Sequence, residues 1–282
     1  MNGLLKLTSE DRFPRQGARV IAVTSGKGGV GKTNLVVNLS LALARLGRRV
    51  IILDADLGLA NAEVLMGVTP LYTLFDCLSG RKEINEILTP APLGVQIISG
   101  GSGFVELANL DSRQQQKIID ALVFLDEADF VLIDTGAGIS RNVLGFVAAA
   151  EEVIVVLTPE PTSLTDAYSL IKILAKFKVH RQVMLVVNRA ADEREAAATV
   201  KKMAAVVERF LEMQLVHLGS ICEDRAVLRA VRGQRPFVLF EPQSRPALNI
   251  EFMARRLANE ECSVPQGKTF RGFVQKMVRF FR

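Results

Sequence analysis

The stretch Val20-Ile-Ala-Val-Thr-Ser-Gly-Lys-Gly-Gly-Val-Gly-Lys-Thr33 decides how this chain folds. A short run suited to a buried strand leads into a glycine-rich loop, and residues 26–33 match the pattern GxxxxGK[ST] in full. Such a loop turns its backbone N–H groups toward phosphate oxygens, and the helix that follows adds its positive N-terminal dipole. The residues of the predicted phosphate site are Gly26, Lys27, Gly28, Gly29, Val30, Gly31, Lys32 and Thr33.

Runs like residues 20–25 recur along the chain and alternate with stretches of helical periodicity. They are continuously apolar, which is typical of strands buried on both faces, so we predict a doubly wound, mainly parallel α/β sheet of the P-loop NTPase type. The predicted strands are 20–25, 50–54, 95–98, 130–134, 153–158, 183–188 and 216–221. The predicted helices are 33–46, 111–125, 163–177, 193–213 and 247–258.

Four segments are predicted: an N-terminal extension at 1–18, the P-loop domain at 19–257, a linker at 258–268 and an amphipathic helix at 269–282. With 49% apolar residues among 282, the chain can bury a sizeable core. It has no apolar run long enough to span a bilayer and no signal-peptide pattern. Its three cysteines form no CxxC pair, so we expect a cytoplasmic protein without a disulfide framework or a zinc site.

The positive charge is concentrated in the C-terminal tail. The whole chain carries a formal charge of +5, and residues 266–282 contain five basic residues and no acidic one. Residues 1–265 therefore sum to zero, from 30 basic and 30 acidic residues. Net charge gives no argument for a nucleic-acid partner, and none is expected.

Lys27 is an additional lysine inside the loop, and Lys-Gly-Gly-Val-Gly-Lys-Thr resembles the deviant Walker A signature of the MinD/ParA class of ATPases. The resemblance implies an ATP-dependent homodimer in which Lys27 reaches the nucleotide of the partner. It also implies hydrolysis of ATP to ADP and phosphate. From the motif itself, Lys32 reaches the β- and γ-phosphates and the Thr33 hydroxyl can ligate Mg²⁺.

Carboxylates follow two of the predicted strands. Asp54 and Asp56 leave the carboxyl edge of the sheet together, and Asp134 ends the apolar run at 130–134 as a Walker B residue. In the family, Asp56 matches the residue that positions or activates water, and Asp54 matches the one near Mg²⁺. The resemblance thus implies Lys27, Lys32 and Asp56 as catalytic residues, with Thr33, Asp54 and Asp134 at the metal.

The base is predicted to be adenine. GTPases usually read guanine with Asn-Lys-x-Asp, whereas the corresponding strand here ends Val187-Asn188-Arg189-Ala190-Ala191 without that aspartate. By resemblance, Asn188, Arg189, Glu223 and Asp224 lie at the adenine. Cys222 stands where relatives typically have proline, and we interpret it as a small buried residue.

Residues 270–282 form an amphipathic pattern. At about 100° per residue, their apolar side chains fall within an arc of about 160°, and basic residues occupy the opposite side. The pattern predicts a helix lying on an anionic membrane surface; docking on the body of the protein or on a partner helix is the alternative. The predicted membrane-contacting residues are Phe270, Phe273, Val274, Met277, Phe280 and Phe281.

Within the class, residues 31–61, 158–172 and 223–248 look most like the flagellar-number ATPases known as FlhG, FleN or YlxH. This resemblance implies peripheral attachment to the cytoplasmic face of the inner membrane and control of flagellar number and placement. It also implies three kinds of partner: an FlhF-type GTPase, flagellar C-ring proteins or a flagellar transcription activator. Residues 1–18 lack the Asp-Gln-Ala motif of many FlhG proteins, which puts stimulation of FlhF in doubt. Alternatives are a MinD-like division-site ATPase, a ParA-like partitioning ATPase, an electron-transfer ATPase and a P-loop kinase.

Overall fold

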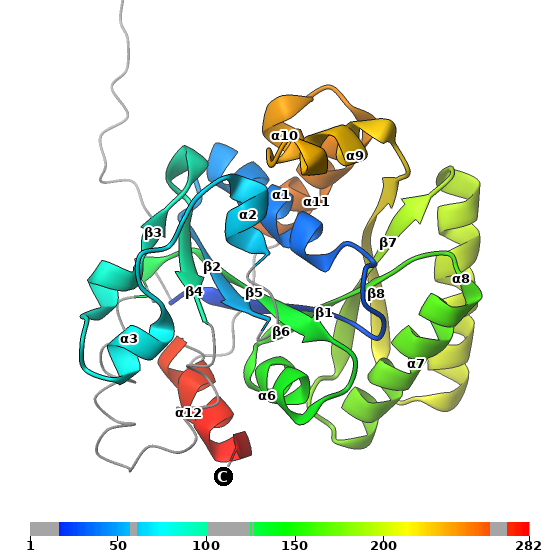
Figure 1. Cartoon of the computed structure of the whole chain (residues 1–282). Coiled ribbons are helices and arrows are strands. Elements are labelled where there is room, and N and C mark those ends of the chain that lie inside the picture. Colours follow the sequence, from blue (N-terminus) through cyan, green and yellow to red (C-terminus); the bar gives the residue numbers. More distant parts are fainter. Residues whose placement is uncertain (1–16, 57–60, 101–124, 126, 260–269, 282) are drawn as a thin grey trace, which may run out of the picture.

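In the described part of the chain, an eight-stranded sheet has the strand order β3-β4-β2-β5-β1-β6-β7-β8 (Figure 1). The structure is a computed structural model that describes residues 17–56, 61–100, 125, 127–259 and 270–281. Neighbouring strands are parallel except β3, which pairs antiparallel with β4 at one edge. The predicted doubly wound, mainly parallel sheet is therefore confirmed. The strands are β1 (Arg19–Ser25), β2 (Val50–Ala55), β3 (Thr89–Pro90), β4 (Gln96–Ser99), β5 (Phe130–Ala137), β6 (Glu152–Leu157), β7 (Gln182–Ala190) and β8 (Gln214–Cys222).

Successive side chains of the central strand enter two different cores. Val20 and Ala22 of β1 belong to one buried cluster, whereas Ile21 and Val23 belong to the other. Because side chains alternate along a strand, a strand covered on both faces needs apolar residues at every position. The continuous apolar runs in the sequence follow from this two-sided burial.

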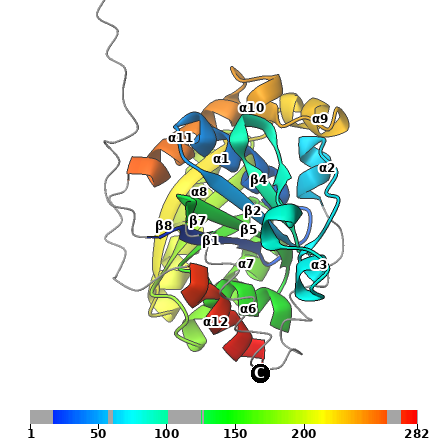
Figure 2. The ribbon, with the colours of Figure 1, turned by 90° about the vertical axis from the view of Figure 1, so that its left-hand side faces the viewer.

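Helices cover the sheet in two layers (Figures 1 and 2). One layer holds α1 and α11, which pack against each other, and the other holds α6, α7 and α8. The last helix, α12, lies against α6 in this second layer (Figure 2). The helices are α1 (Lys32–Arg45), α2 (Ala62–Met66), α3 (Leu74–Leu78), α6 (Arg141–Ala149), α7 (Pro161–Lys176), α8 (Glu193–Phe210), α9 (Arg225–Arg232), α10 (Phe237–Phe240), α11 (Arg245–Asn259) and α12 (Phe270–Phe281), with short 3-10 turns η1 (Ile84–Ile87) and η2 (Pro92–Gly94).

Two helices at functional positions were not predicted. α6 has only nine residues and contains Gly145, so its apolar pattern is short. α9 has only eight residues, and its fully buried residues are the alanines Ala226 and Ala230, so its apolar pattern is short. The helix predicted at 111–125, apart from its last residue, and most of the segments 1–18 and 258–268 lie outside the described residues. No helix in the described ranges is long and apolar enough to cross a membrane.

Candidate nucleotide site

The glycine-rich loop lies where the strand order of the sheet reverses. β1 is flanked by β5 on one side and β6 on the other, and residues 26–31 connect its carboxyl end to α1. Parallel α/β sheets bind ligands at such a switch point because the loops on either side diverge and leave a crevice. Lys32, the first residue of α1, is buried with an exposed fraction of 8%.

Gly31 lets the loop approach the end of β7. Its φ of 96° is left-handed, and a β-carbon at this position would lie 2.3 Å from the Asn188 side-chain nitrogen. The Asn188 amide nitrogen donates to the Val30 carbonyl at 2.7 Å, so the side chain ties β7 to the loop. Asn188 therefore also shapes the phosphate loop, a contact between positions 158 residues apart that the sequence pattern did not indicate.

Gly26 meets the backbone of α7. A β-carbon on Gly26 would lie 2.2 Å from the Asp166 carbonyl carbon and 2.7 Å from the Ala167 nitrogen. Neither backbone atom can move without shifting the helix. This glycine is thus required by packing between the loop and α7, in addition to any role toward phosphate.

Two acidic side chains lie side by side at the carboxyl edge of the sheet. Asp54 of β2 is the register partner of Asp134 of β5, and their exposed fractions are 2% and 1%. Burial, followed by the neighbouring Asp134 charge, raises the pKa of Asp54 to about 7. Burial also raises the pKa of Asp134 to about 6, while the nearby Thr33 hydroxyl and Lys32 ammonium limit the rise.

These groups fit a P-loop magnesium ion. Both carboxylate oxygens of Asp134 are buried, and neither has a hydrogen-bond partner within the described ranges. Both Asp54 oxygens accept backbone N–H groups, from Asp56 at 3.1 Å and from Ala62 at 3.3 Å. No group of three or more His, Cys, Asp or Glu side chains in the described part of the chain could hold a metal alone. Mg²⁺ at such a site relies mainly on phosphate and water oxygens, so it needs few protein contacts, and Thr33, Asp54 and Asp134 stay the predicted ones.

Asp56 follows β2 and lies next to the loop after β5. Its Oδ1 atom would be 3.7 Å from a β-carbon built on Gly136, and its charge contributes to the raised pKa of Asp134. The structure therefore brings Asp56, Asp134 and the phosphate loop together. The roles of Asp54 and Asp56 toward metal and water stay predictions.

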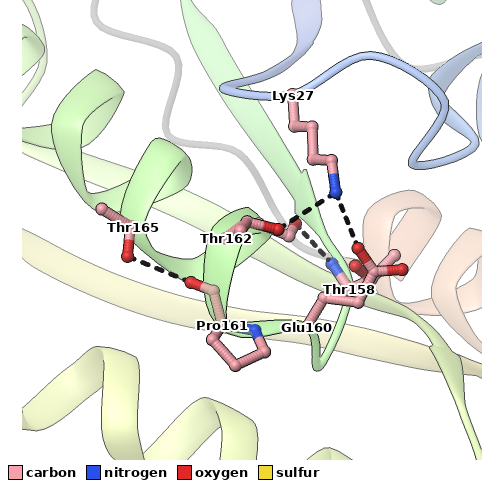
Figure 3. Close-up of polar contacts among 7 residues, drawn as sticks. Lys27, Thr158, Glu160, Pro161, Thr162 and Thr165 are labelled. Atoms are coloured by element: carbon pink, nitrogen blue, oxygen red, sulfur yellow. Dashed lines mark hydrogen bonds and ion pairs between the residues drawn. The ribbon is translucent and has the colours of Figure 1, made fainter.

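Lys27 points away from the loop toward the start of α7 (Figure 3). Its ammonium lies 2.7 Å from the Glu160 carboxylate and 3.0 Å from the Thr162 hydroxyl. Lys27 lowers the pKa of Glu160 by a hydrogen bond and by its charge. The ion pair is exposed, so water screens it and the lysine can change partners.

A pocket of about 300 Å³ adjoins the loop at Gly31 and contains all four residues predicted at the adenine. Val227, Leu228 and Val231 of α9 add an apolar wall, which suits the face of a base. Sequence reasoning missed this wall because α9 was not predicted. The lining residues are Gly31, Asn34, Asn188, Arg189, Cys222, Glu223, Asp224, Val227, Leu228 and Val231. A larger cavity of about 420 Å³ between α8 and α11 includes no residue of the phosphate loop.

The predicted membrane-contacting residues divide into two groups. Phe273, Val274 and Met277 have exposed fractions of at most 2% and share a buried cluster with Phe146 and Val147 of α6. Phe280 is 37% exposed, and its carbonyl accepts a hydrogen bond from Arg141 at 3.4 Å. The side chains of Phe270 and Phe281 lie outside the described residues. In this structure α12 is docked, which is the alternative left open by its pattern.

Comparison with known proteins defines the class of this site. The ParA family model, described as an NUBPL iron-transfer P-loop NTPase, matches residues 16–258. A structure of MinD with Mg-ADP from Pyrococcus horikoshii superposes with a TM-score of 0.69 at 29% identity, covering 86% of this chain and 96% of that one. The chain belongs to the MinD/ParA family of P-loop NTPases.

Within that family the chain is similar to flagellar regulators. It is 41% identical over 262 residues to "Antiactivator FleN" of Pseudomonas aeruginosa, covering 93% of this chain and 94% of FleN. It is 33% identical over 244 residues to "Flagellum site-determining protein YlxH" of Helicobacter pylori, covering 86% and 82%. The resemblance inferred from the motifs is therefore confirmed.

Proposed function

We propose that this protein is a Mg²⁺-dependent ATPase whose ATP-bound form dimerises and binds an anionic membrane surface through α12. The phosphate loop holds the triphosphate, with Lys32 at its β- and γ-phosphates. Mg²⁺, when bound, neutralises phosphate charge near Thr33 and Asp134. Asp56 orients the attacking water, and Lys27 leaves Glu160 to reach the nucleotide of the partner protomer.

The observation that carries the membrane switch is the place where α12 docks. Asp134 lies near the carboxyl end of β5, which ends at Ala137, and α6 begins at Arg141 directly after residues 138–140. α12 packs on this same helix. A change at the γ-phosphate that moves the segment after Asp134 therefore acts directly on the α6 surface where α12 docks. Release of α12 from α6 then exposes Phe273, Val274 and Met277 to lipid.

The exposed face of α12 supports attachment to anionic lipid. Gln275, Lys276 and Arg279 are exposed in the docked state, and no acidic residue lies on the helix. Each basic residue near an anionic surface contributes about 1 kcal/mol, so a single helix binds weakly and reversibly. Two helices on one dimer bind far more firmly, because the second attachment is intramolecular.

The biological process we propose is control of flagellar number and placement, supported by the similarity to FleN and YlxH. Partners of this switch are then a flagellar transcription activator, C-ring proteins or an FlhF-type GTPase. Its site of action is the cytoplasmic face of the inner membrane.

Sedimentation with phosphatidylglycerol vesicles tests the switch. The full-length chain with ADP is compared with its Asp56→Ala variant with ATP. We use this variant for the ATP state because we expect it to retain ATP. We expect sedimentation with ATP and much less with ADP. The control is Lys276→Glu/Arg279→Glu in the Asp56→Ala background, because both residues are exposed and their reversal leaves the docked face intact. Equal sedimentation in ADP and ATP, or sedimentation that the reversal does not reduce, would rule out this switch.

A further inference from the structure

Arg189 interrupts β7 just beside the phosphate loop. Its φ is 57°, a left-handed value that is unfavourable for a residue with a β-carbon. The pairing of β7 with β8 shifts register between Asn188 and Ala190, so Arg189 forms a bulge. Strained backbone of this kind persists where the surrounding structure determines it, and it is concentrated at functional sites.

The bulge is tied to the loop through Asn188. The Arg189 N–H donates to the Asn188 side-chain oxygen at 2.9 Å, and the Asn188 amide donates to the Val30 carbonyl at 2.7 Å. Asn188 thus holds the loop and the strained residue at once. The Arg189 side chain is exposed at the rim of the base pocket, and no hydrogen bond or ion pair of its guanidinium is found within the described ranges.

Glu160 is an anion on which the charge of this guanidinium acts. β6 and β7 are parallel neighbours in which Leu157 is opposite Val187, so Glu160 and Arg189 follow these two residues at the same edge of the sheet. Arg189 is also one of the charges that lower the pKa of Glu160, after Lys27. The Glu160 carboxylate therefore has two cations near it: Lys27, bound at 2.7 Å, and Arg189, for which the described part of the chain shows no ion pair.

We propose that Arg189 is a positioning residue that takes over the Glu160 carboxylate when Lys27 leaves it for the nucleotide of the partner protomer. This inference rests on the proposed ATP-dependent dimer. Without Arg189, departure of Lys27 leaves an unpaired carboxylate beside the incoming triphosphate, which opposes release of the lysine. With Arg189, the carboxylate exchanges one cation for another, and a guanidinium can bind both of its oxygens.

The full-length protein tests this with variants at both residues. Arg189→Gly removes the side chain and suits the left-handed backbone, so it separates the side chain's role from folding. The other variants are Arg189→Lys, Glu160→Gln and the double variant Arg189→Gly/Glu160→Gln. Arg194→Ala is the matched control, since Arg194 is an exposed arginine at the start of α8. ATP hydrolysis is measured against ATP and protein concentration, and dimerisation by sedimentation velocity with a non-hydrolysable ATP analogue.

We expect Arg189→Gly to lower kcat about five- to tenfold at an unchanged KM for ATP. The association constant of the dimer should fall by a similar factor. Arg189→Lys recovers most of this loss because it keeps the charge. Arg189→Gly/Glu160→Gln behaves like Glu160→Gln alone, because no carboxylate is left to hold Lys27. Arg194→Ala matches the wild-type protein.

A raised KM with unchanged kcat in Arg189→Gly, not rescued by Glu160→Gln, would assign Arg189 to the base alone and overturn the inference. Unchanged dimerisation in Arg189→Gly would overturn it as well. A wild-type protein that stays monomeric with the analogue would overturn the proposed dimer, and with it this inference.

Discussion

Lys27 and Glu160 are joined by a 2.7 Å ion pair that links the phosphate loop to the first turn of α7. The two residues are 133 positions apart, and their side chains are 39% and 55% exposed. The pair holds within its own protomer the lysine that the family motif assigns to the partner's nucleotide. In the dimer that we propose, this ion pair breaks before Lys27 reaches the nucleotide of the partner.

Replacing Glu160 by glutamine should favour the dimer. Glu160→Gln removes the anion that holds Lys27, so we expect ATP-dependent dimerisation at a several-fold lower protein concentration. Thermal stability should change little, because exposed ion pairs contribute about 0–1 kcal/mol. Sedimentation velocity with a non-hydrolysable ATP analogue measures the first effect and a melting curve the second. Weaker dimerisation of Glu160→Gln would mean that Glu160 acts in the dimer itself.

Two glycines of the same loop should respond differently to alanine. In Gly26→Ala the added carbon meets the α7 backbone at 2.2 Å, so we expect a destabilisation of at least about 2 kcal/mol. Gly28→Ala is the control, because a β-carbon there has no atom within 4 Å. Chemical denaturation without nucleotide compares the two variants. Equal stability would show that the loop and α7 are not packed as described.

Removing the Asp134 charge should stabilise the protein in the absence of Mg²⁺ and nucleotide. Its raised pKa of about 6 means that the folded state binds more protons than the unfolded state between about pH 4 and pH 6. Wild-type stability therefore falls as pH rises through this window, and the full destabilisation by the buried charge is present above it. Asp134→Asn should be more stable at pH 8, by about 3 kcal/mol at most, and should lose this advantage below pH 4.

Melting curves of the wild-type protein and of Asp134→Asn, recorded in EDTA from pH 4 to pH 8, measure this difference in stability. The same variant should lose the stabilisation that Mg-ATP gives the wild-type protein, since Asp134 is one of the protein contacts we expect for the ion. A variant less stable than wild type at pH 8 would contradict the cost assigned to the buried carboxylate.

Hydrogen exchange should report the docked state of α12. In ADP the amides of residues 273–277 should be protected, because Phe273, Val274 and Met277 hold this part of the helix against α6. In the Asp56→Ala variant with ATP, we expect faster exchange over α12 and over the start of α6. The amides of α8 provide an internal reference, as this helix covers other strands of the sheet. Uniform protection of α12 in both states would exclude nucleotide-controlled undocking.

The sequence by itself determined the phosphate loop, the strand before it and the helix after it, because glycine spacing and apolar runs act through local backbone preferences. It likewise determined the parallel sheet, since strands buried on both faces need continuous apolar runs. Asp54 and Asp134 could be placed at one edge because they follow strands whose carboxyl ends meet there.

Only the tertiary structure decided which distant groups complete the site. Asn188 bonds to Val30, and Lys27 bonds to Glu160, through packing of β7 and α7 against the loop, which no local pattern encodes. The wall of α9 was equally invisible, because this helix has only eight residues and its place beside the pocket depends on packing of distant elements. The amphipathic pattern of residues 270–282 required an apolar surface but did not specify lipid or protein. The apolar face of α6 settled that choice in this structure, because burying Phe273, Val274 and Met277 against it removes them from water.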